Sequence, residues 1–173
     1  MDLNVKFNVD SGTYRHRMNG FLSVLHCHHY LCLTTRMAIQ FKGIGGIDIL
    51  RSTAEDTLYP LLHEYVTDNN ITAPEARLDI GAQYYSIMGM GKMTATLNRK
   101  GGAVKLFRSH IDQGWLKKWG RAEGHVNHFT CGYIAAMFSV ASDTPPRSFS
   151  VRELESIVSG SKNSYFEVIR KTE

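Results

Sequence analysis

The sequence predicts an α+β fold in which N-terminal helices pack with an antiparallel sheet of two β-hairpins. Helical periodicity runs through most of the chain before residue 91, whereas apolar and polar residues alternate only later, in two pairs of short segments. Each pair is joined by a turn that contains glycine, so its strands are expected to pair antiparallel. The order of helices, hairpin, helix and hairpin is typical of the α+β class.

Three helices are expected in the first half. Asn19 is a suitable helix cap before FLSVLHCHHYLCLTTRMAIQFK, and Gly43 ends that segment, which predicts one helix over 20–42. The segment DILRSTAEDTLYPLLHEYV has helical periodicity, and we expect Pro60 to kink or divide this helix. Pro74 opens a third helix, which is expected to end at a pair of glycines before residue 92.

The second half contains the strands. KMTATL and AVKLF alternate around the turn 98–102, which predicts the first hairpin, and an irregular linker follows. HVNHFTCGYIAAMFSV then predicts a helix, which ends at the breaker Asp143-Thr-Pro-Pro146. The last two strands are expected in SFSVRELESIVSG and NSYFEVIRK, joined by a turn at Gly160.

Length and composition indicate a single domain over 1–173, with a helical part at 1–75 and an α+β part at 76–173. The chain has 173 residues, of which 43% are hydrophobic, enough to bury a core without disulfides or a structural metal. Three cysteines are too few for a disulfide framework, so we expect a reducing compartment and a cytoplasmic location. We find no secretory signal pattern and no run near the about 18 apolar residues of a membrane span.

Basic residues concentrate between Arg99 and Arg121, where seven of them accompany a single acidic residue, Asp112. Such a concentration is one feature of nucleic-acid binding. Because this segment is expected to contain a turn and a loop, where lysines are ordinary, we favour a solvated face and do not expect nucleic acid as a partner.

A register of residues in 125–168 resembles the 4-vinyl reductase domain family. Its positions are Phe129, Gly132 and Tyr133 in a helix of small residues, then Glu153, Ser156, Gly160, Ser164 and Phe166. In that family the positions of the two serines are cysteines, and members that bind zinc use them as ligands. A hydroxyl is a far poorer zinc ligand than a thiolate, so we do not expect that zinc site in this chain.

The resemblance implies a fold related to a superfamily of vesicle-tethering subunits, a homodimer, and an internal apolar cavity. Members of the family include sensor domains for aromatic effectors and proteins linked to tetrapyrrole biosynthesis. The resemblance therefore implies binding of a small hydrophobic or aromatic molecule. It implies no particular reaction, because a fold alone does not fix function.

Histidines are concentrated on two of the predicted helices. His26 and His29 are three residues apart on the first helix, and His125 and His128 have the same spacing at the start of the later one, so each pair lies on one helix face. If the two helices are neighbours, the four imidazoles provide a site for a transition metal such as zinc or iron. The alternatives are a polar pocket without metal and purely structural histidines.

Aromatic residues are candidates to line a cavity between the same two helices, with the histidines as polar anchors: Tyr30, Tyr84, Tyr85, Trp115, Phe129 and Tyr133. Taken singly, each is explained equally well by ordinary core packing. Met88, Met90 and Met93 offer an adaptable wall beside them, or act as filler.

These residues are compatible with more than one class of function. The favoured hypothesis is a sensor or carrier that binds a small apolar or aromatic molecule and forms a homodimer. The alternative is a metal- or His-dependent enzyme, a hydrolase or an enzyme that modifies aromatic compounds or tetrapyrroles, which uses the same four histidines. A structural interaction module is a third hypothesis, and it predicts a filled core.

Overall fold

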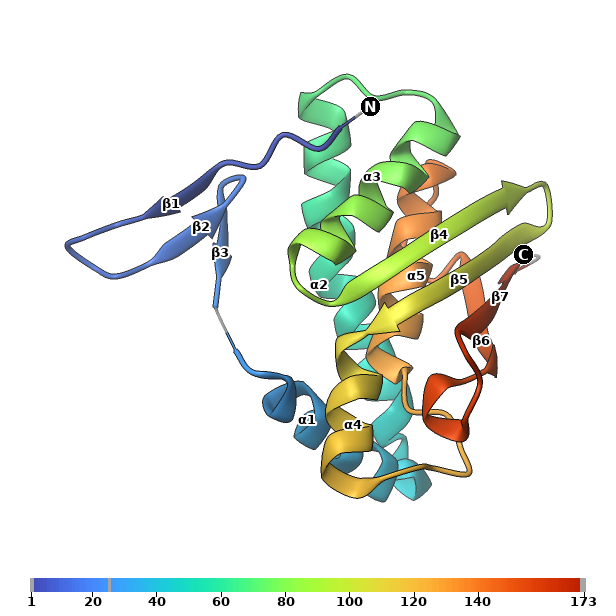
Figure 1. Ribbon diagram of the computed structural model, residues 1–173. Coiled ribbons are helices and arrows are strands. Elements are labelled where there is room, and N and C mark those ends of the chain that lie inside the picture. The colour runs from blue at the N-terminus through green and yellow to red at the C-terminus, as the bar shows by residue number, and fades with distance from the viewer. Residues whose placement is uncertain (1, 25, 172–173) are drawn as a thin grey trace.

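A four-stranded antiparallel sheet, backed on one face by helices, forms the main body of the computed structural model, which describes residues 2–24 and 26–171 (Figure 1). Its strands, in spatial order, are β4 (Gly91–Asn98), β5 (Gly101–Ser109), β7 (Ser164–Arg170) and β6 (Phe149–Glu155). The pairs β4/β5 and β6/β7 are the two predicted hairpins, and they join through β5 and β7. The predicted α+β class with a sheet of two hairpins is therefore confirmed.

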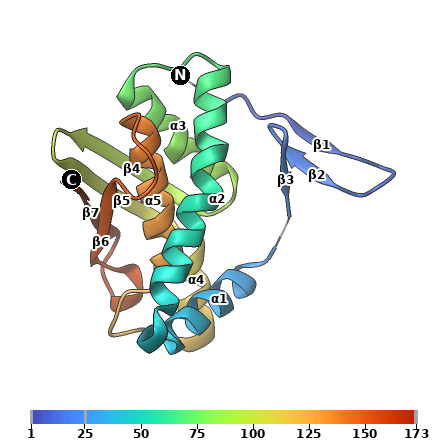
Figure 2. The same cartoon turned by 180° about the vertical axis from the view of Figure 1, so that it is seen from behind.

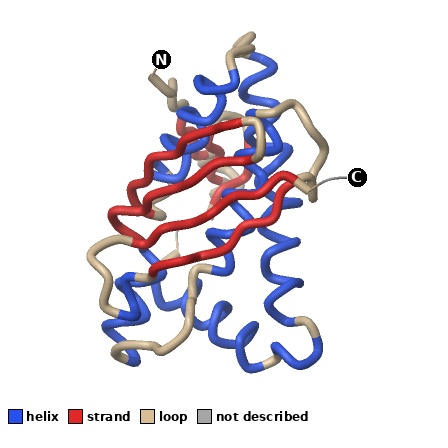
Figure 3. The backbone as a smooth tube through the Cα atoms, turned by 90° about the vertical axis from the view of Figure 1, so that its right-hand side faces the viewer, coloured by secondary structure: helices blue, strands red, loops and turns tan. Residues whose placement is uncertain are grey.

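The helical layer lies behind this sheet, as the side view shows (Figure 3). It contains α2 (Gly46–Asp68), α3 (Pro74–Ile87) and α5 (His128–Ala141), and α5 packs against the other two and against β6. All residues of α5 except Phe129 are buried, because the helix lies between α2 and the sheet. None of the helices in the described part of the chain is long and apolar enough to cross a membrane.

The predicted first helix is wrong over its first turns. The helix α1 runs only from His28 to Gln40, and Phe21–Ser23 is instead strand β3 of a small sheet with β1 (Phe7–Val9) and β2 (His16–Met18). Asn19 and Gly20 have φ angles of 48° and 91°, so they form the tight turn between β2 and β3. An Asn-Gly pair favours such a hairpin turn, and here this preference prevails over the capping role of asparagine.

Two further expectations are wrong in detail. The helix α2 continues through Pro60 as one element, so the proline does not divide it. The linker predicted to be irregular contains α4 (His110–Trp119), whose first turn is capped by Ser109: its Oγ accepts a hydrogen bond from the Asp112 amide at 3.0 Å. The helix predicted to follow this linker is confirmed as α5, and a short 3₁₀ turn (Ile157–Ser159) separates the last two strands.

The basic residues between 99 and 121 are spread over separate surfaces. Arg99 and Lys100 lie at the β4–β5 turn, and Lys117 and Lys118 lie in the last turn of α4. All four side chains are exposed. This distribution fits the solvated face that we favoured from the sequence, and the expectation that nucleic acid is not a partner stays a prediction.

The first segment of the chain forms an N-terminal arm, residues 5–24, that lies beside the body and not within it (Figures 1 and 2). Hydrogen bonds at its base attach it to the helices. The Asn4 amide donates to the Tyr65 hydroxyl at 3.0 Å, and Asn19 Nδ2 donates to the hydroxyl of Tyr84. The side chain of Met18 is buried at the same place.

We predict that Gly132→Ala destabilises the protein strongly. A Cβ atom at this position would lie 2.2 Å from the carbonyl oxygen of Arg51, so α2 and α5 would have to separate. Overpacking of this kind costs about 3 kcal/mol, which urea or thermal unfolding detects. Gly124→Ala is the matched control because its Cβ meets nothing within 4 Å. Equal stability of the two variants would contradict the close approach of the helices.

Candidate functional site

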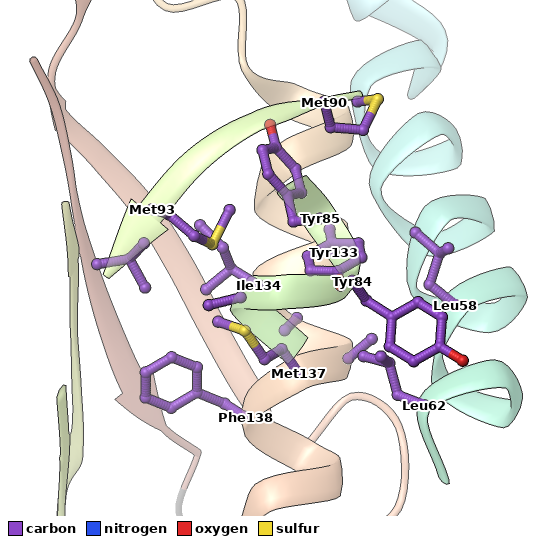
Figure 4. Close-up of a cluster of buried hydrophobic side chains, with 14 of the residues drawn as sticks. Leu58, Leu62, Tyr84, Tyr85, Met90, Met93, Tyr133, Ile134, Met137 and Phe138 are labelled. Carbon is purple, nitrogen blue, oxygen red and sulfur yellow. The ribbon is translucent and has the colours of Figure 1, made fainter. Parts of the chain in front are cut away.

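A cluster of tyrosine and methionine side chains fills the space between α3, β4 and α5 (Figure 4). We call it the tyrosine–methionine core, and its members are Tyr85, Met90, Met93, Tyr133 and Met137. The rings of Tyr85 and Tyr133 meet edge to face with centroids 5.0 Å apart. Both tyrosines are fully buried, so a large aromatic surface lies inside the protein.

The two tyrosine hydroxyls in this core have hydrogen-bond partners. The Tyr133 hydroxyl donates to the carbonyl oxygen of Gly81 at 2.6 Å, and the Tyr85 hydroxyl shares a hydrogen bond of 2.9 Å with Thr130 Oγ1. Burial raises the pKa of both phenols above the ordinary value for tyrosine, so both are neutral. The Tyr85–Thr130 pair is therefore a neutral polar point at the edge of an apolar cluster.

Methionine makes one wall of this core adaptable. Met137 lies directly against Gly81, where an added Cβ would be 2.4 Å from Met137 Cγ. The unbranched thioether can change rotamer at low cost, and it makes favourable contacts with aromatic rings. Met90 and Met93, which the sequence suggested as an adaptable wall, lie buried in the same cluster.

A network of buried polar side chains lies next to this core. We call it the carboxylate network, and its members are Ser109, Asp112, Asn127, Glu153 and Ser164. Asn127 Nδ2 donates to both carboxylate oxygens of Asp112, at 2.9 and 3.1 Å, and to Oε1 of Glu153 at 2.8 Å. The amide oxygen of Asn127 accepts from Ser109 Oγ at 3.1 Å. One side-chain amide thus holds two carboxyl groups together inside the protein.

Four elements supply the members of this network. Ser109 caps α4 and Asp112 lies in its first turn, while Asn127 immediately precedes α5. Glu153 belongs to β6 and Ser164 is the first residue of β7. The network therefore fixes the starts of α4 and α5 relative to the sheet.

The two carboxyl groups determine the electrostatics of this region. Burial is the main cause that raises the pKa of Asp112 to about 6; the nearby charge of Glu153 adds to it, and the hydrogen bond from Asn127 opposes it. The same two carboxyl groups raise the pKa of Tyr85, in addition to the larger effect of burial. The charged forms of these two carboxyl groups disfavour an anion at the Tyr85–Thr130 pair.

The zinc-binding register that the resemblance implies includes Glu153 and Ser164 of this network, together with Ser156, which is buried but not a member of it. The residues present do not suit zinc. Two of the three positions offer hydroxyls, and the amide hydrogens of Asn127 already occupy three carboxylate oxygens that a cation would need. In family members that bind zinc, thiolates and the metal connect these segments. Here the Asn127 amide and the Ser164 hydroxyl connect them by hydrogen bonds.

The structure does not bring the two predicted histidine pairs together. His26 precedes α1 and is exposed, and His29 lies in the first turn of that helix, so the two do not share a helix face. The main contacts of α1 are with α2 and α4, whereas α5 packs on α2, α3 and β6, so the expected pairing of α1 with α5 is wrong.

The other pair is also divided. His125 is exposed, with Nδ1 3.7 Å from Oε2 of Glu153, whereas His128 is buried and its Nδ1 lies 3.3 Å from a guanidinium nitrogen of Arg51. Burial, with the charge of Arg51, lowers the pKa of His128 to about 4. In the described part of the chain, no three His, Cys, Asp or Glu side chains are arranged to hold a metal. Zinc or iron on the histidines remains a prediction.

The structure places the predicted aromatic residues in different environments. Tyr84, Tyr85 and Tyr133 are all fully buried. The rings of Tyr85 and Tyr133 meet, whereas the ring of Tyr84 packs edge to face against Tyr65 of α2. Phe129 lies half-buried at the start of α5, while Tyr30 is 65% exposed on α1. Trp115 packs on Trp119 within α4, with centroids 4.7 Å apart. The aromatic cluster thus lies between α3, β4 and α5, and not between α1 and α5 as expected.

Comparison with solved structures finds the same arrangement of elements in a known domain. The fold is similar to that of a domain whose crystal structure is known. The crystal structure of the phenol-responsive sensory domain of the transcription activator PoxR with phenol matches with a TM-score of 0.79. The match covers 95% of this chain and 84% of that chain at 13% sequence identity, so it concerns the fold alone. No family model and no curated protein matches the sequence.

Sequence reasoning missed most of the carboxylate network. Its members are far apart in the chain, and only Glu153 and Ser164 belonged to a recognised register. One signal was available: Ser109-x-x-Asp112 has the spacing of a capping box, so it marks the start of α4. Asp112 is also the one acidic residue in a basic segment, and its burial explains that exception.

The raised pKa of Asp112 gives a pH-dependent stability that Asp112→Asn removes. Because the folded-state pKa of about 6 exceeds the ordinary 3.8, the folded protein binds the proton more tightly, and the stabilisation is present at low pH and lost as pH rises through 6. The unfolding free energy of the wild type, minus that of the variant, should fall by about 2 kcal/mol between pH 4 and 7.

The comparison of wild type with Asp112→Asn also controls for the titration of His128. Its lowered pKa makes stability rise with pH over about the same range, but equally in both proteins, so its effect cancels in the difference. Denaturant unfolding at several pH values supplies the measurement. Parallel stability curves for wild type and variant would contradict the assignment to Asp112.

Proposed function

We propose that this chain is a sensor or carrier that binds a small, neutral aromatic molecule in the tyrosine–methionine core. The observation that carries this proposal is the fold, which extends over nearly the whole chain and over most of a sensory domain whose crystal structure contains phenol. The register that resembles the 4-vinyl reductase domain family lies in the same part of the fold and supports membership of that family.

The residues of the core support the same chemistry. Its walls are aromatic rings and thioethers, which bind a flat apolar ring well. The Tyr85 and Thr130 hydroxyls share one hydrogen bond. A ligand hydroxyl can form a hydrogen bond to this pair or take the place of one partner. Movement of Met137 away from Gly81 would provide room without breaking a hydrogen bond.

The carboxylate network supports a neutral ligand over an anionic one. Asp112 and Glu153 both act on the hydroxyl of Tyr85, and their charge would repel a carboxylate placed there. We therefore propose that the sensor binds phenol-like compounds, and that benzoate-like compounds are poor ligands. A homodimer and a reducing, cytoplasmic setting, which suits the three free cysteines, belong to the same proposal.

Calorimetric titration with phenol, toluene and benzoate tests this function. We expect phenol to bind best, toluene to bind more weakly because it lacks the hydroxyl, and benzoate to bind worst. Thermal unfolding should shift upward with phenol concentration, since a ligand of the folded state stabilises it. If no compound in this series binds and native mass spectrometry finds no retained small molecule, the proposal is wrong.

Thr130→Val is the variant that tests the place of binding. It keeps the shape of the side chain and removes the hydroxyl that pairs with Tyr85, so phenol affinity should fall about tenfold while toluene affinity changes little. Tyr30→Phe is the control, because that hydroxyl is on an exposed ring and its loss should leave both affinities unchanged. An equal loss for phenol and toluene would indicate a folding defect and not a lost contact.

Elemental analysis of the same preparation tests the alternative. Near-stoichiometric zinc or iron that is lost in a His26→Ala/His29→Ala variant would support the metal- or His-dependent enzyme. Metal-free protein that binds phenol would support the sensor.

A further inference from the structure

A groove of about 870 Å³ lies at one end of the main sheet, where the β4–β5 turn, the loop between α5 and β6 and the end of β7 meet. We call it the basic groove. The turn supplies Arg99 and Lys100, the loop supplies Arg147, and the end of β7 with the residue after it supplies Arg170 and Lys171. The described lining thus contains five basic side chains and no acidic one.

Backbone hydrogen bonds hold the three segments of this groove together. The Arg170 amide donates to the Lys100 carbonyl oxygen at 2.8 Å, and the Lys171 amide donates to the Ser148 carbonyl oxygen at 2.9 Å. The end of β7 accordingly lies beside the β4–β5 turn (Figure 1). Basic residues from distant parts of the sequence therefore share one concave surface.

Arg147 fixes the loop that forms one wall of the basic groove. Its φ angle of 75° lies in the left-handed region, which a residue other than glycine rarely adopts. Its amide donates to Glu55 Oε1 at 2.6 Å, and its guanidinium donates to Glu55 Oε2 and to Asp56 Oδ2, both at 2.7 Å. Because these bonds hold the loop in place beforehand, a partner pays little for ordering it.

The charge of the basic groove is not balanced from within. Glu55 and Asp56 neutralise Arg147. The other four basic side chains are exposed, and none of them forms an ion pair with a carboxylate of the described residues. Like charges gathered in one concavity raise the local potential and attract an anionic partner.

The remaining lining residues indicate which kind of anion fits. Pro145, Pro146 and Ile169 add apolar surface, and the Ile169 side chain is 50% exposed. None of the described lining residues is aromatic, so the bases of a nucleic acid would find no ring to stack on. Carboxylates flanked by apolar side chains match this mixture of charge and apolar surface better than a phosphate backbone does.

We propose that the basic groove binds an acidic peptide segment of a protein partner. The carboxylates of the segment would pair with the four unbalanced basic side chains, and an apolar side chain would lie against Ile169. Arg99 and Lys100, which the sequence alone placed on a solvated face, then belong to an interaction surface. The groove shares no residue with the tyrosine–methionine core, so this inference does not depend on binding of an aromatic ligand.

Fluorescence anisotropy with a labelled peptide of repeated Glu-Asp-Leu tests this inference. We expect a Kd of about 10 μM at about 50 mM salt, and an affinity about tenfold lower at about 300 mM salt, because salt screens exposed charges. A peptide of repeated Gln-Asn-Leu with the same length should bind at least about tenfold more weakly, since it keeps the apolar side chains and lacks the charge.

Charge reversal on two separate walls tests the place of binding. Arg99→Glu/Lys100→Glu in the turn and Arg170→Glu/Lys171→Glu at the end of β7 should each lower the affinity for the acidic peptide at least about tenfold. Circular dichroism should show that both variants remain folded. Loss in one variant only would contradict a site that both walls share.

Lys117→Glu/Lys118→Glu is the matched control. It makes the same change in net charge at two adjacent exposed lysines, which lie on α4 and do not line the groove. We expect it to bind the acidic peptide about as well as the wild type. A loss as large as that of the groove variants would show a general charge attraction and overturn the proposal.

Two further results would overturn it. One is the absence of binding to the acidic peptide at about 50 mM salt. The other is tighter binding of a labelled oligothymidylate that both groove variants abolish, which would make the groove a nucleic-acid surface.

Discussion

The rest of the structure depends on the side-chain amide of Asn127, which lies between two buried carboxyl groups. Removing a carboxylate from water is costly unless it gains hydrogen bonds, and two of them close together add mutual repulsion. The amide reduces both costs by donating to Asp112 and to Glu153. Ser164 Oγ donates to Asp112 as well, and Ser109 Oγ donates to the amide oxygen of Asn127. The raised pKa of Asp112 reflects burial first and this repulsion second.

The position of this amide has structural consequences along α5. Asn127 immediately precedes the helix, so the direction in which α5 leaves the network sets where Thr130, Tyr133 and Met137 lie. The close approach of α2 at Gly132 then leaves little freedom for the helix to shift. The carboxylate network and the close contact at Gly132 thus constrain α5, whereas the neighbouring methionine side chains can adapt.

Much of the main sheet could be predicted from the sequence, because the patterns that specify strands and hairpin turns lie within short segments of the chain. Alternation and turn residues identified both hairpins, and the apolar length of α5 identified that helix. The N-terminal sheet was not predicted, since Asn19 suits a helix cap and a tight turn equally well and only its φ angle of 48° decides between them. The network was also not predicted, because Asp112, Asn127 and Glu153 come together only after four elements have packed. Two of the candidate aromatics, Tyr85 and Tyr133, did come into contact, but between α3 and α5 and not beside α1.

Serine at positions 156 and 164 changes the conditions under which this fold holds together. A thiolate centre loses its metal when zinc is scarce and is damaged when peroxide oxidises its sulfur. The centre of this domain is built from oxygen and nitrogen atoms, so it offers an oxidant no sulfur among its own hydrogen-bonding groups. The stability of this network depends on pH instead, through the protonation of Asp112.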